Sequence, residues 1–298
     1  MIKGSELPSI KALRTFMAVS STMSFSKAAE ELAISQGAVS KQISALERQL
    51  GQPLFHRHIN GIELTNAGKR YLPKVSEALQ IIQSSTANVL QSDQERDLLT
   101  VNVTPSFASL WLIEKIEAFT QRFPHIQVSI KTGDGMVKNS NSDHDIFIRC
   151  LPLSQHYEHA TLLQKETLLL VASPTLTKKN PIRKKDDLNK HHFIPQVTRP
   201  QLWEQFKNEL ELSFEPDYRR VGYEHFYMSL TAVTDNRGMA LLPDFMVAPM
   251  QKKGLLVNPL SMRMKSSFGY YVIIPSYKKG LRKVYEFESW LNNELGEN

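Results

Sequence analysis

The chain has little cysteine and no long apolar run, and both absences exclude classes of protein. Its 298 residues include one cysteine, Cys150, so an intramolecular disulfide framework is impossible. No apolar stretch reaches the length of about 18 residues that a membrane helix needs, and no apolar signal core follows the first residues. The sequence therefore predicts a protein of the reducing cytoplasm that does not contact a membrane.

Motifs for cofactors, metals and catalysis are also missing. The sequence contains neither GxGxxG nor GxxxxGK[ST], which cradle nucleotide phosphates, and no GxSxG. Two histidine pairs, His156/His159 and His191/His192, lack a third ligand in register, so a surface position is favoured over a metal site. We therefore expect no enzyme activity, no cofactor and no metal.

Residues 25–65 have the pattern of a helix-turn-helix followed by a wing. A short helix is predicted with Ala28, Ala29 and Leu32 on its apolar face and Ser26 as its N-cap. A second helix is predicted from the N-cap Ser35 to the stop at Gly51. Its apolar face comprises Ala38, Val39, Ile43, Leu46 and Leu50. Its other face is short, polar and free of acid, as insertion into a major groove requires: Gln36, Gly37, Ser40, Lys41 and Ser44. Ser35 at the N-cap is a further candidate for DNA contact.

The wing is predicted from the residues after Gly51. Pro53 to Phe55 should pack the domain, and Asn60-Gly61 is a strong hairpin-turn signal with Arg57 and His58 at its flank. Each polar residue taken alone fits a solvated face as well as DNA contact. The combination predicts that Lys41, Arg57 and His58 bind phosphates, and that Gln36 and Ser40 touch base edges.

The segment AAEELAISQGAVSKQISALERQLGQPLF (28–55) resembles the LysR-type transcriptional regulators in residue order and spacing. LPSIKALRTF (7–16) is most similar to the branch that contains activators of glycine-cleavage and β-lactamase genes. Two positions depart from the family: Gly37 stands where Ala, Pro or Ser is more frequent, and Asn60 replaces a frequent Arg. The resemblance implies a regulator that binds double-stranded DNA, with RNA polymerase as a further candidate partner.

Charge is distributed unevenly. Of the formal net charge of +6, residues 1–92 carry +4, from 10 Lys and Arg against 6 Asp and Glu, and residues 93–298 carry +2. The basic excess is concentrated where DNA contact is predicted. A second basic cluster between Lys178 and Lys190 is interrupted by Asp186-Asp187, and a solvated loop is favoured there over a second DNA surface.

A long helix from Asn66 to about residue 92, capped by Thr65, is predicted to carry a heptad seam. The seam comprises Leu72, Val75, Leu79, Ile82 and Val89. Pro73 should kink this helix without ending it. One such seam cannot bury itself, and the resemblance implies a homodimer or homotetramer joined here; packing against the chain's own second domain is the alternative. Residues 93–97 lose apolar periodicity and are predicted to be a hinge.

From Leu98 onward, short apolar runs alternate with amphipathic helices, which is α/β order. Strands are predicted at 98–103, 126–130, 146–148, 168–172, 193–194, 239–242 and 270–274, and helices at 110–123 and 281–295. The resemblance implies a periplasmic-binding-protein-like effector domain over 98–298. Its subdomain one would hold residues 98–172 plus 270–298, and subdomain two residues 173–269. The expected fold is thus a winged helix-turn-helix (1–65), a linker helix (66–92) and this α/β domain.

An effector, small and anionic, is expected between the subdomains at the carboxyl ends of strands. Thr104, Ser106 and Phe107 follow the first strand, where Ser106 either holds a carboxylate or only caps a helix. Arg149 either forms a bidentate pair with the effector or makes a structural ion pair. Tyr223, His225 and Phe226 either line the cleft or belong to the core.

A different role for the C-terminal half is oligomerisation, partner binding or redox response without a small ligand. Cys150 beside Arg149 could have an activated thiol, although an inert buried cysteine is favoured. The sequence thus predicts a LysR-type, sequence-specific regulator controlled by an effector.

Overall fold

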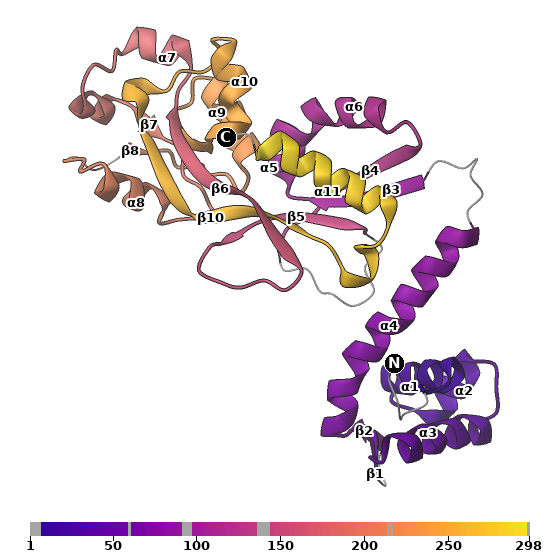
Figure 1. The fold of residues 1–298 in the computed structure, drawn as a ribbon. Coiled ribbons are helices and arrows are strands. Elements are labelled where there is room, and N and C mark those ends of the chain that lie inside the picture. Colours follow the sequence, from indigo (N-terminus) through magenta and orange to yellow (C-terminus); the bar gives the residue numbers. More distant parts are fainter. Residues whose placement is uncertain are drawn as a thin grey trace. The chain divides into compact units, whose positions relative to one another are not determined.

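The computed structural model describes residues 7–58, 61–90, 97–135, 144–213, 215 and 217–296 (Figure 1); the side chains of residues 84 and 87–90 lie outside this description. The chain divides into two compact units: the first comprises residues 1–95 together with the short segment Ser276–Lys278, and the second comprises most of the remaining chain. None of the described helices combines the length and the apolar character that a membrane crossing needs.

The N-terminal unit is a helical domain with a two-stranded hairpin. Its elements are α1 (Ile10–Thr22), α2 (Phe25–Glu31), α3 (Gln36–Leu50), β1 (Phe55–His58), β2 (Gly61–Leu64) and α4 (Asn66–Leu90). The side chains of Phe16, Val39 and Ile43 are completely buried in one core. The predicted apolar face of α3 is correct for Val39, Ile43 and Leu46, but Leu50 at its last turn is exposed.

Serine hydroxyls begin the three helices of this domain's first half, as N-caps do. Ser35 caps α3 as predicted, its Oγ accepting from the Ala38 N–H at 3.2 Å, and Gly51 ends α3 with a left-handed φ of 68°. The predicted cap of α2 was wrong by two residues. Ser24 Oγ accepts from the Lys27 N–H at 3.3 Å, and Ser26 lies inside the helix because Phe25 is already helical.

The wing is an antiparallel hairpin in which Phe55 pairs with Leu64 and His58 with Gly61. Gly61 is therefore the first residue of β2 and not part of the turn; Asn60 lies outside the described residues. Thr65 joins wing and helix: its hydroxyl accepts from the Gly68 N–H at 3.0 Å and donates to Pro53 O at 2.8 Å. The predicted cap of α4 thus also anchors the segment before the wing.

The predicted seam of α4 divides into an inner and an outer part. Val75 is 4% exposed inside the N-terminal core, and Leu72 and Leu79 pack partly against it, so the assignment of Val75 to a seam between copies is corrected. The same 3–4 spacing serves packing on the unit's own helices, since α4 contacts α1. Ile82 is 46% exposed. The side chain of Val89 lies outside the described residues.

The C-terminal unit is built on a six-stranded sheet of order β4-β3-β5-β10-β6-β9. Its strands are β3 (Asp97–Val103), β4 (Ile126–Thr132), β5 (Ile146–Pro152), β6 (Ala160–Val171), β9 (Ala240–Pro243) and β10 (Arg263–Ile273), beside the short pair β7 (His192–Phe193) and β8 (Asp217–Tyr218). Strands β4, β3 and β5 are parallel, and β10 pairs antiparallel with β5 and β6. Because β3 begins at Asp97, the predicted hinge is one residue too long.

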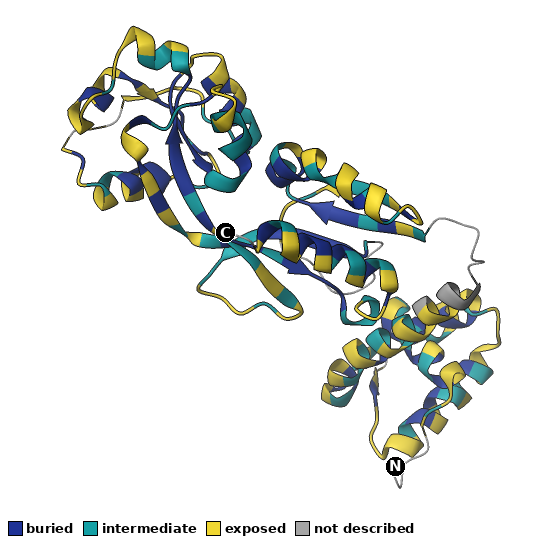
Figure 2. Cartoon of the chain, turned by 45° about the horizontal axis from the view of Figure 1, so that its top comes forward, coloured by how far each residue is buried: buried dark blue, intermediate teal, exposed yellow. Residues whose placement is uncertain are grey.

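Helices cover this sheet and leave yellow outer faces over dark blue strands (Figure 2). They are α5 (Pro105–Phe107), α6 (Ile113–Arg122), α7 (Pro174–Lys179), α8 (Leu202–Glu209), α9 (Phe226–Thr234), α10 (Asp244–Lys252) and α11 (Arg282–Leu295). A π-helical segment at Ala108–Leu112 joins α5 to α6, so the helical run begins five residues before the predicted start at Leu110. Short 3₁₀ segments lie at Lys185–Lys190, Pro259–Ser261 and Ser276–Lys278.

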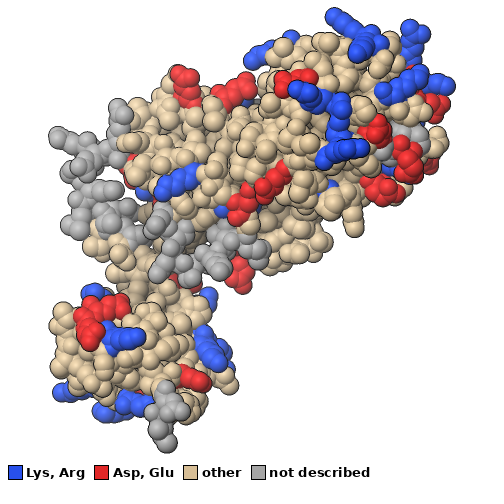
Figure 3. All heavy atoms as spheres, turned by 180° about the vertical axis from the view of Figure 1, so that it is seen from behind, with Lys and Arg blue, Asp and Glu red and all other residues tan. Residues whose placement is uncertain are grey.

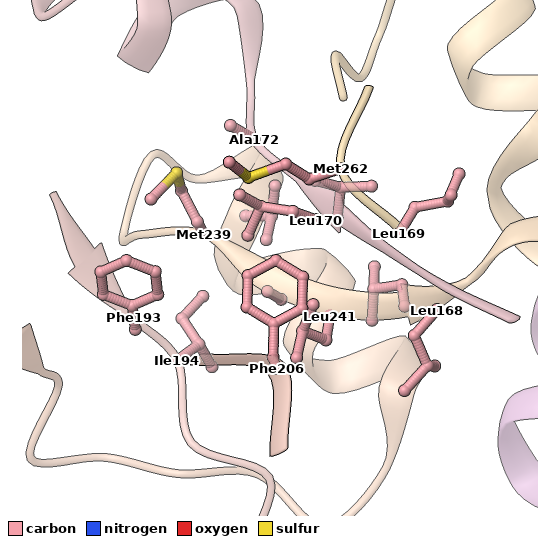
Figure 4. Close-up of a cluster of buried hydrophobic side chains, with 14 of the residues drawn as sticks. Leu168, Leu169, Leu170, Ala172, Phe193, Ile194, Phe206, Met239, Leu241 and Met262 are labelled. Atoms are coloured by element: carbon pink, nitrogen blue, oxygen red, sulfur yellow. The ribbon is translucent and has the colours of Figure 1, made fainter. Parts of the chain in front are cut away.

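Two apolar cores define the two subdomains. In subdomain one, the ring of Phe119 on α6 meets Phe287 on α11 edge-on, with centroids 5.1 Å apart. In subdomain two, Leu168–Ala172 cluster with Phe206 and Leu241 (Figure 4). The predicted boundary after residue 172 is therefore corrected: β6 and β10 both run through the two cores, and the carboxyl half of β6 packs in subdomain two.

Candidate functional site

The outward face of α3 is the first candidate site. Ser35, Gln36, Gly37 and Lys41 are exposed, and Ser40 is half-buried. A Cβ added at Gly37 would meet only Ser35 Oγ, at 4.0 Å, so the ridge is open at this point. An uncluttered helix with short polar side chains at its amino end has the shape that a major groove accepts.

Arg57 connects the wing to this ridge. Its guanidinium carbon lies 4.4 Å from the centroid of the Phe25 ring, and its Nη2 lies 3.5 Å from Ser40 Oγ. Stacking on an aromatic ring holds the cation in place while its edge stays hydrated. The wing arginine is therefore presented beside α3, and His58 is exposed on the same strand.

Glu47, the acidic residue of α3, makes structural hydrogen bonds to the start of the wing. One carboxylate oxygen of Glu47 accepts from the backbone N–H groups of Leu54 at 2.8 Å and Phe55 at 3.2 Å. Glu47 thereby fixes the start of the wing on the end of α3. The helical pattern of the sequence did not indicate this role of Glu47.

The second candidate site is a cavity of about 260 Å³ in the C-terminal unit, between the subdomains. It is lined by Thr104, Ser106, Asp134, Gly135, Cys150, Gln196, Thr198, Arg199, Glu224, His225, Phe226, Phe268 and Tyr270. Two contacts link the subdomains at this cavity: the Tyr227 N–H donates to Ser106 Oγ at 3.4 Å, and His225 Nε2 lies 3.9 Å from Asp134 Oδ2.

Of the residues predicted to bind the effector, Thr104, Ser106 and Phe226 line this cavity. Two other predicted effector residues, Phe107 and Tyr223, do not line this cavity. Phe107 is fully buried in subdomain one, where its ring packs on Trp111 with centroids 4.9 Å apart. Tyr223 lines a different groove, beside α9, and packs partly against the core of subdomain two.

Arg149 does not present its guanidinium to the cavity. Its N–H groups donate to Asn102 O at 3.0 Å, Asn102 Oδ1 at 2.5 Å and Gly135 O at 3.2 Å. Burial lowers the pKa of Arg149, an effect that Asp134 opposes. Among the described residues neither reading of Arg149 holds, because its fork binds backbone and amide oxygens. Asp145, the nearest acid on the same strand segment, instead accepts from the Thr100 N–H and lies 3.5 Å from Lys283 Nζ.

The floor of the cavity holds a buried ion pair that the sequence did not indicate. Arg199 Nη1 donates to Glu166 Oε2 at 2.5 Å, and Glu166 is 1% exposed. The same carboxylate accepts from Ser266 Oγ at 2.6 Å and from Tyr270 OH at 3.2 Å. Three polar groups, from Arg199 and from Ser266 and Tyr270, therefore bond to one buried carboxylate.

An irregularity in the sheet builds this floor. The pairing of β10 with β6 shifts between Lys265 and Gly269, so Glu166 alone opposes residues 266–268. A bulge of this kind redirects side chains. It brings the Phe268 ring to 4.0 Å from the guanidinium carbon of Arg199. The sequence held no clear signal for this role, because Glu166 stands among the polar residues Gln164, Lys165 and Thr167.

Cys150 belongs to the same cluster and is not activated. Its Sγ lies 3.1 Å from Arg199 Nη2 and 3.6 Å from Glu166 Oε1. Burial and, next, the charge of Glu166 raise the pKa of the thiol to about 12, although Arg199 lowers it. The cation beside this thiol is therefore Arg199 and not its sequence neighbour Arg149, and the thiol stays protonated at neutral pH.

The basic cluster between Lys178 and Lys190 is partly neutralised. Lys190 Nζ lies 2.9 Å from Asp187 Oδ1, and Lys184 Nζ lies 3.3 Å from Asp186 Oδ2. Blue side chains gather around the end of the unit that carries α7, with red ones among them (Figure 3). This mixture of signs is typical of a solvated surface.

Comparison with known proteins gives the same family for both units. Residues 10–69 match "Bacterial regulatory helix-turn-helix protein, lysR family", and residues 92–296 match "LysR substrate binding domain". The glycine cleavage system transcriptional activator of Escherichia coli (strain K12) is 31% identical over 286 residues, which are 96% of this chain and 93% of that protein. The HTH-type transcriptional activator AmpR of Providencia stuartii is 29% identical, over 96% of each chain.

Solved structures share the fold. CrgA, a LysR-type transcriptional regulator from Neisseria meningitidis, superposes with a TM-score of 0.55 at 22% identity, over 97% of this chain and 99% of that chain. The effector domain of AmpR from Pseudomonas aeruginosa has a TM-score of 0.57 at 21% identity, over 67% of this chain and 96% of that chain. The chain therefore belongs to the LysR family of transcriptional regulators, with a helix-turn-helix domain for DNA and a C-terminal domain for an effector.

Proposed function

We propose that α3 reads base edges through Gln36 and Ser40 while Lys41, Arg57 and His58 bind phosphates. Residues 1–65 would bind DNA, 66–92 would join copies of the chain, and 98–298 would bind the effector. The observation that carries the proposal is the exposed, acid-free face of α3 with Arg57 held against Ser40 at 3.5 Å. Assembly into dimers or tetramers and contact with RNA polymerase are further parts of it, taken from the family.

Two substitutions separate base reading from phosphate binding. DNA is first selected from a random library with the full chain, and binding to the selected duplex is compared with binding to a scrambled duplex. Gln36→Ala should cost about 1–3 kcal/mol on the selected duplex and little on the scrambled one. Arg57→Ala should weaken both equally and reduce the slope of log K against log salt by about 1.

Gln52→Ala serves as the control, because Gln52 is exposed just after α3 and outside the proposed contact face. Equal losses for Gln36→Ala on the two duplexes would refute its role in reading bases. Failure of the full chain to enrich any sequence from the library would refute specific DNA binding by α3.

For the C-terminal domain, we propose that an effector in the cavity shifts the subdomains between two arrangements. The bond between Ser106 and Tyr227 and the pair of Asp134 with His225 cross the cavity, which supports this role. An effector can shift the balance only by its different affinity for the two arrangements. Its binding should raise the melting temperature by mass action.

A further inference from the structure

We infer that the effector is a small zwitterion of amino-acid size, with an ammonium group held by Glu224 and Asp134 and a carboxylate held by Arg199 and the hydroxyl groups of Thr104 and Ser106. The inference rests on the proposed function, because it presumes that the cavity between the subdomains takes the effector. It replaces the anionic effector expected from the sequence.

The cations of the cavity are already matched by anions or bonds, which argues against an effector that is only an anion. Arg199 is paired with the buried Glu166, so the two add no net charge. Arg149 donates its N–H groups to Asn102 and Gly135 and is not among the lining residues. A carboxylate alone would therefore enter a site without a surplus positive charge.

The carboxylates of the cavity point to a cationic group on the effector. Asp134 and Glu224 both line the cavity, one from each subdomain. Within the described part of the chain, neither has a lysine or arginine nitrogen within the 4.0 Å of an ion pair, and Asp134 has His225 Nε2 at 3.9 Å. An ammonium group donates three hydrogen bonds and suits a cavity that is lined by two such carboxylates.

Other residues of the cavity lining offer donors for a carboxylate. Arg199 uses one N–H on Glu166 and one on Cys150, and its guanidinium is clamped between the Phe268 ring at 4.0 Å and the Phe226 ring at 5.3 Å. The remaining N–H groups of this rigid fork belong to a residue that lines the cavity. Thr104, which also lines the cavity, makes no side-chain capping bond at the start of α5.

The size of the cavity limits the effector. About 260 Å³ is less than the roughly 300–1,000 Å³ of pockets for drug-sized ligands. The aromatic residues Phe226, Phe268 and Tyr270 also line the cavity and offer contacts to a short apolar side chain. These features together describe an α-amino acid.

The test uses the full chain and matched compounds. The twenty L-amino acids are screened by thermal shift and calorimetry, together with simple carboxylates, amines, sugars and nucleosides. Each amino acid that binds is compared with the acid that lacks its amino group and the amine that lacks its carboxylate. We expect each analogue to bind about tenfold or more weakly, since a charged hydrogen bond is lost.

Variants then place the ammonium group. Glu224→Gln should weaken the amino acid about tenfold but leave the acid without an amino group unaffected. Glu209→Gln, on the exposed face of α8 and away from the cavity, should change neither. If an acid without an amino group binds as tightly as its amino acid, the inference is overturned and the effector role of the cavity stands. If no compound of any class binds, both are overturned.

Discussion

The effect of a single residue on stability depends on its backbone conformation and surroundings as well as on its type, and two glycines at the ends of α3 give the clearest test. Gly37 lies at the exposed start of α3 with room for a methyl group, whereas Gly51 ends α3 with a φ of 68°. Gly37→Ala should stabilise the domain by about 0.5–1 kcal/mol, because alanine loses less entropy in a helix. Gly51→Ala should destabilise it by about 1 kcal/mol, because its φ is unfavourable for a side chain.

Amide hydrogen exchange of α1 and α3 in the full chain measures both changes in stability. Tryptophan fluorescence would not report on this domain, because the three tryptophans all lie in the C-terminal unit. The two variants make the same chemical change, so each is the control for the other. Shifts of both in one direction would contradict the argument from backbone conformation.

The thiol of Cys150 gives the pH dependence at the scale of one residue. Its pKa is raised to about 12, by burial first and then by Glu166, so its thiolate is scarce at pH 8. Alkylation of the folded chain should be about a hundredfold or more slower than that of the urea-unfolded chain, and should accelerate only as pH rises toward 12. Cys150 is the one cysteine, so labelling reports this site alone.

Rapid alkylation of the native chain at pH 8 would contradict this expectation and revive the redox hypothesis. The raised pKa of this thiol also makes the free energy of unfolding depend on pH. A thiol with a raised pKa favours the folded state below the unfolded pKa, and that contribution is lost as the pH rises from about 9 toward 12.

At the scale of elements, close backbone approach decides how α4 meets the wing. A Cβ on Gly68 would lie 2.3 Å from Leu54 O and 2.8 Å from Leu64 Cδ2. Gly68→Ala should therefore destabilise the N-terminal unit by about 1–3 kcal/mol, despite the better helix propensity of alanine. Hydrogen exchange of β1 and α4 measures the loss, with Gly37→Ala as the control.

A stabilising Gly68→Ala would mean that propensity outweighs packing here. To make room for the added Cβ at residue 68, the backbone around Leu54 should shift, and β1, which carries Arg57, should then move relative to α3. DNA affinity should then fall on selected and scrambled duplexes alike, since phosphate contacts carry no sequence information.

Elements were predictable from the sequence where one periodicity dominates. The helices α3 and α11 and the apolar strand β3 came from simple patterns. The amino half of β6 has no such pattern, because residues 160–167 mix exposed and half-buried positions around the buried Glu166. The cleft floor was unpredictable for the same reason: Glu166 and Arg199 meet across 33 positions at a bulge that local sequence does not encode.

At the scale of the whole molecule, the exposure of each apolar residue on α4 indicates whether it stabilises its own unit or is available for contact with another copy of the chain. Val75 is 4% exposed and belongs to the core of its own unit, whereas Ile82 is 46% exposed. A regulator that reads two half-sites gains affinity by linking two domains, so loss of assembly should weaken DNA binding more than loss of any one contact.

Val75→Ala should therefore destabilise the N-terminal unit by roughly 1–3 kcal/mol without changing the oligomeric state of the folded chain. Ile82→Ser should leave stability within about 0.5 kcal/mol and weaken self-association, because an exposed apolar contact between copies is lost. Sedimentation velocity over a concentration series measures assembly. Ile34→Ser is the control, since Ile34 is 37% exposed outside α4. Unchanged assembly of Ile82→Ser, with dissociation of a folded Val75→Ala, would restore the seam first read from the sequence.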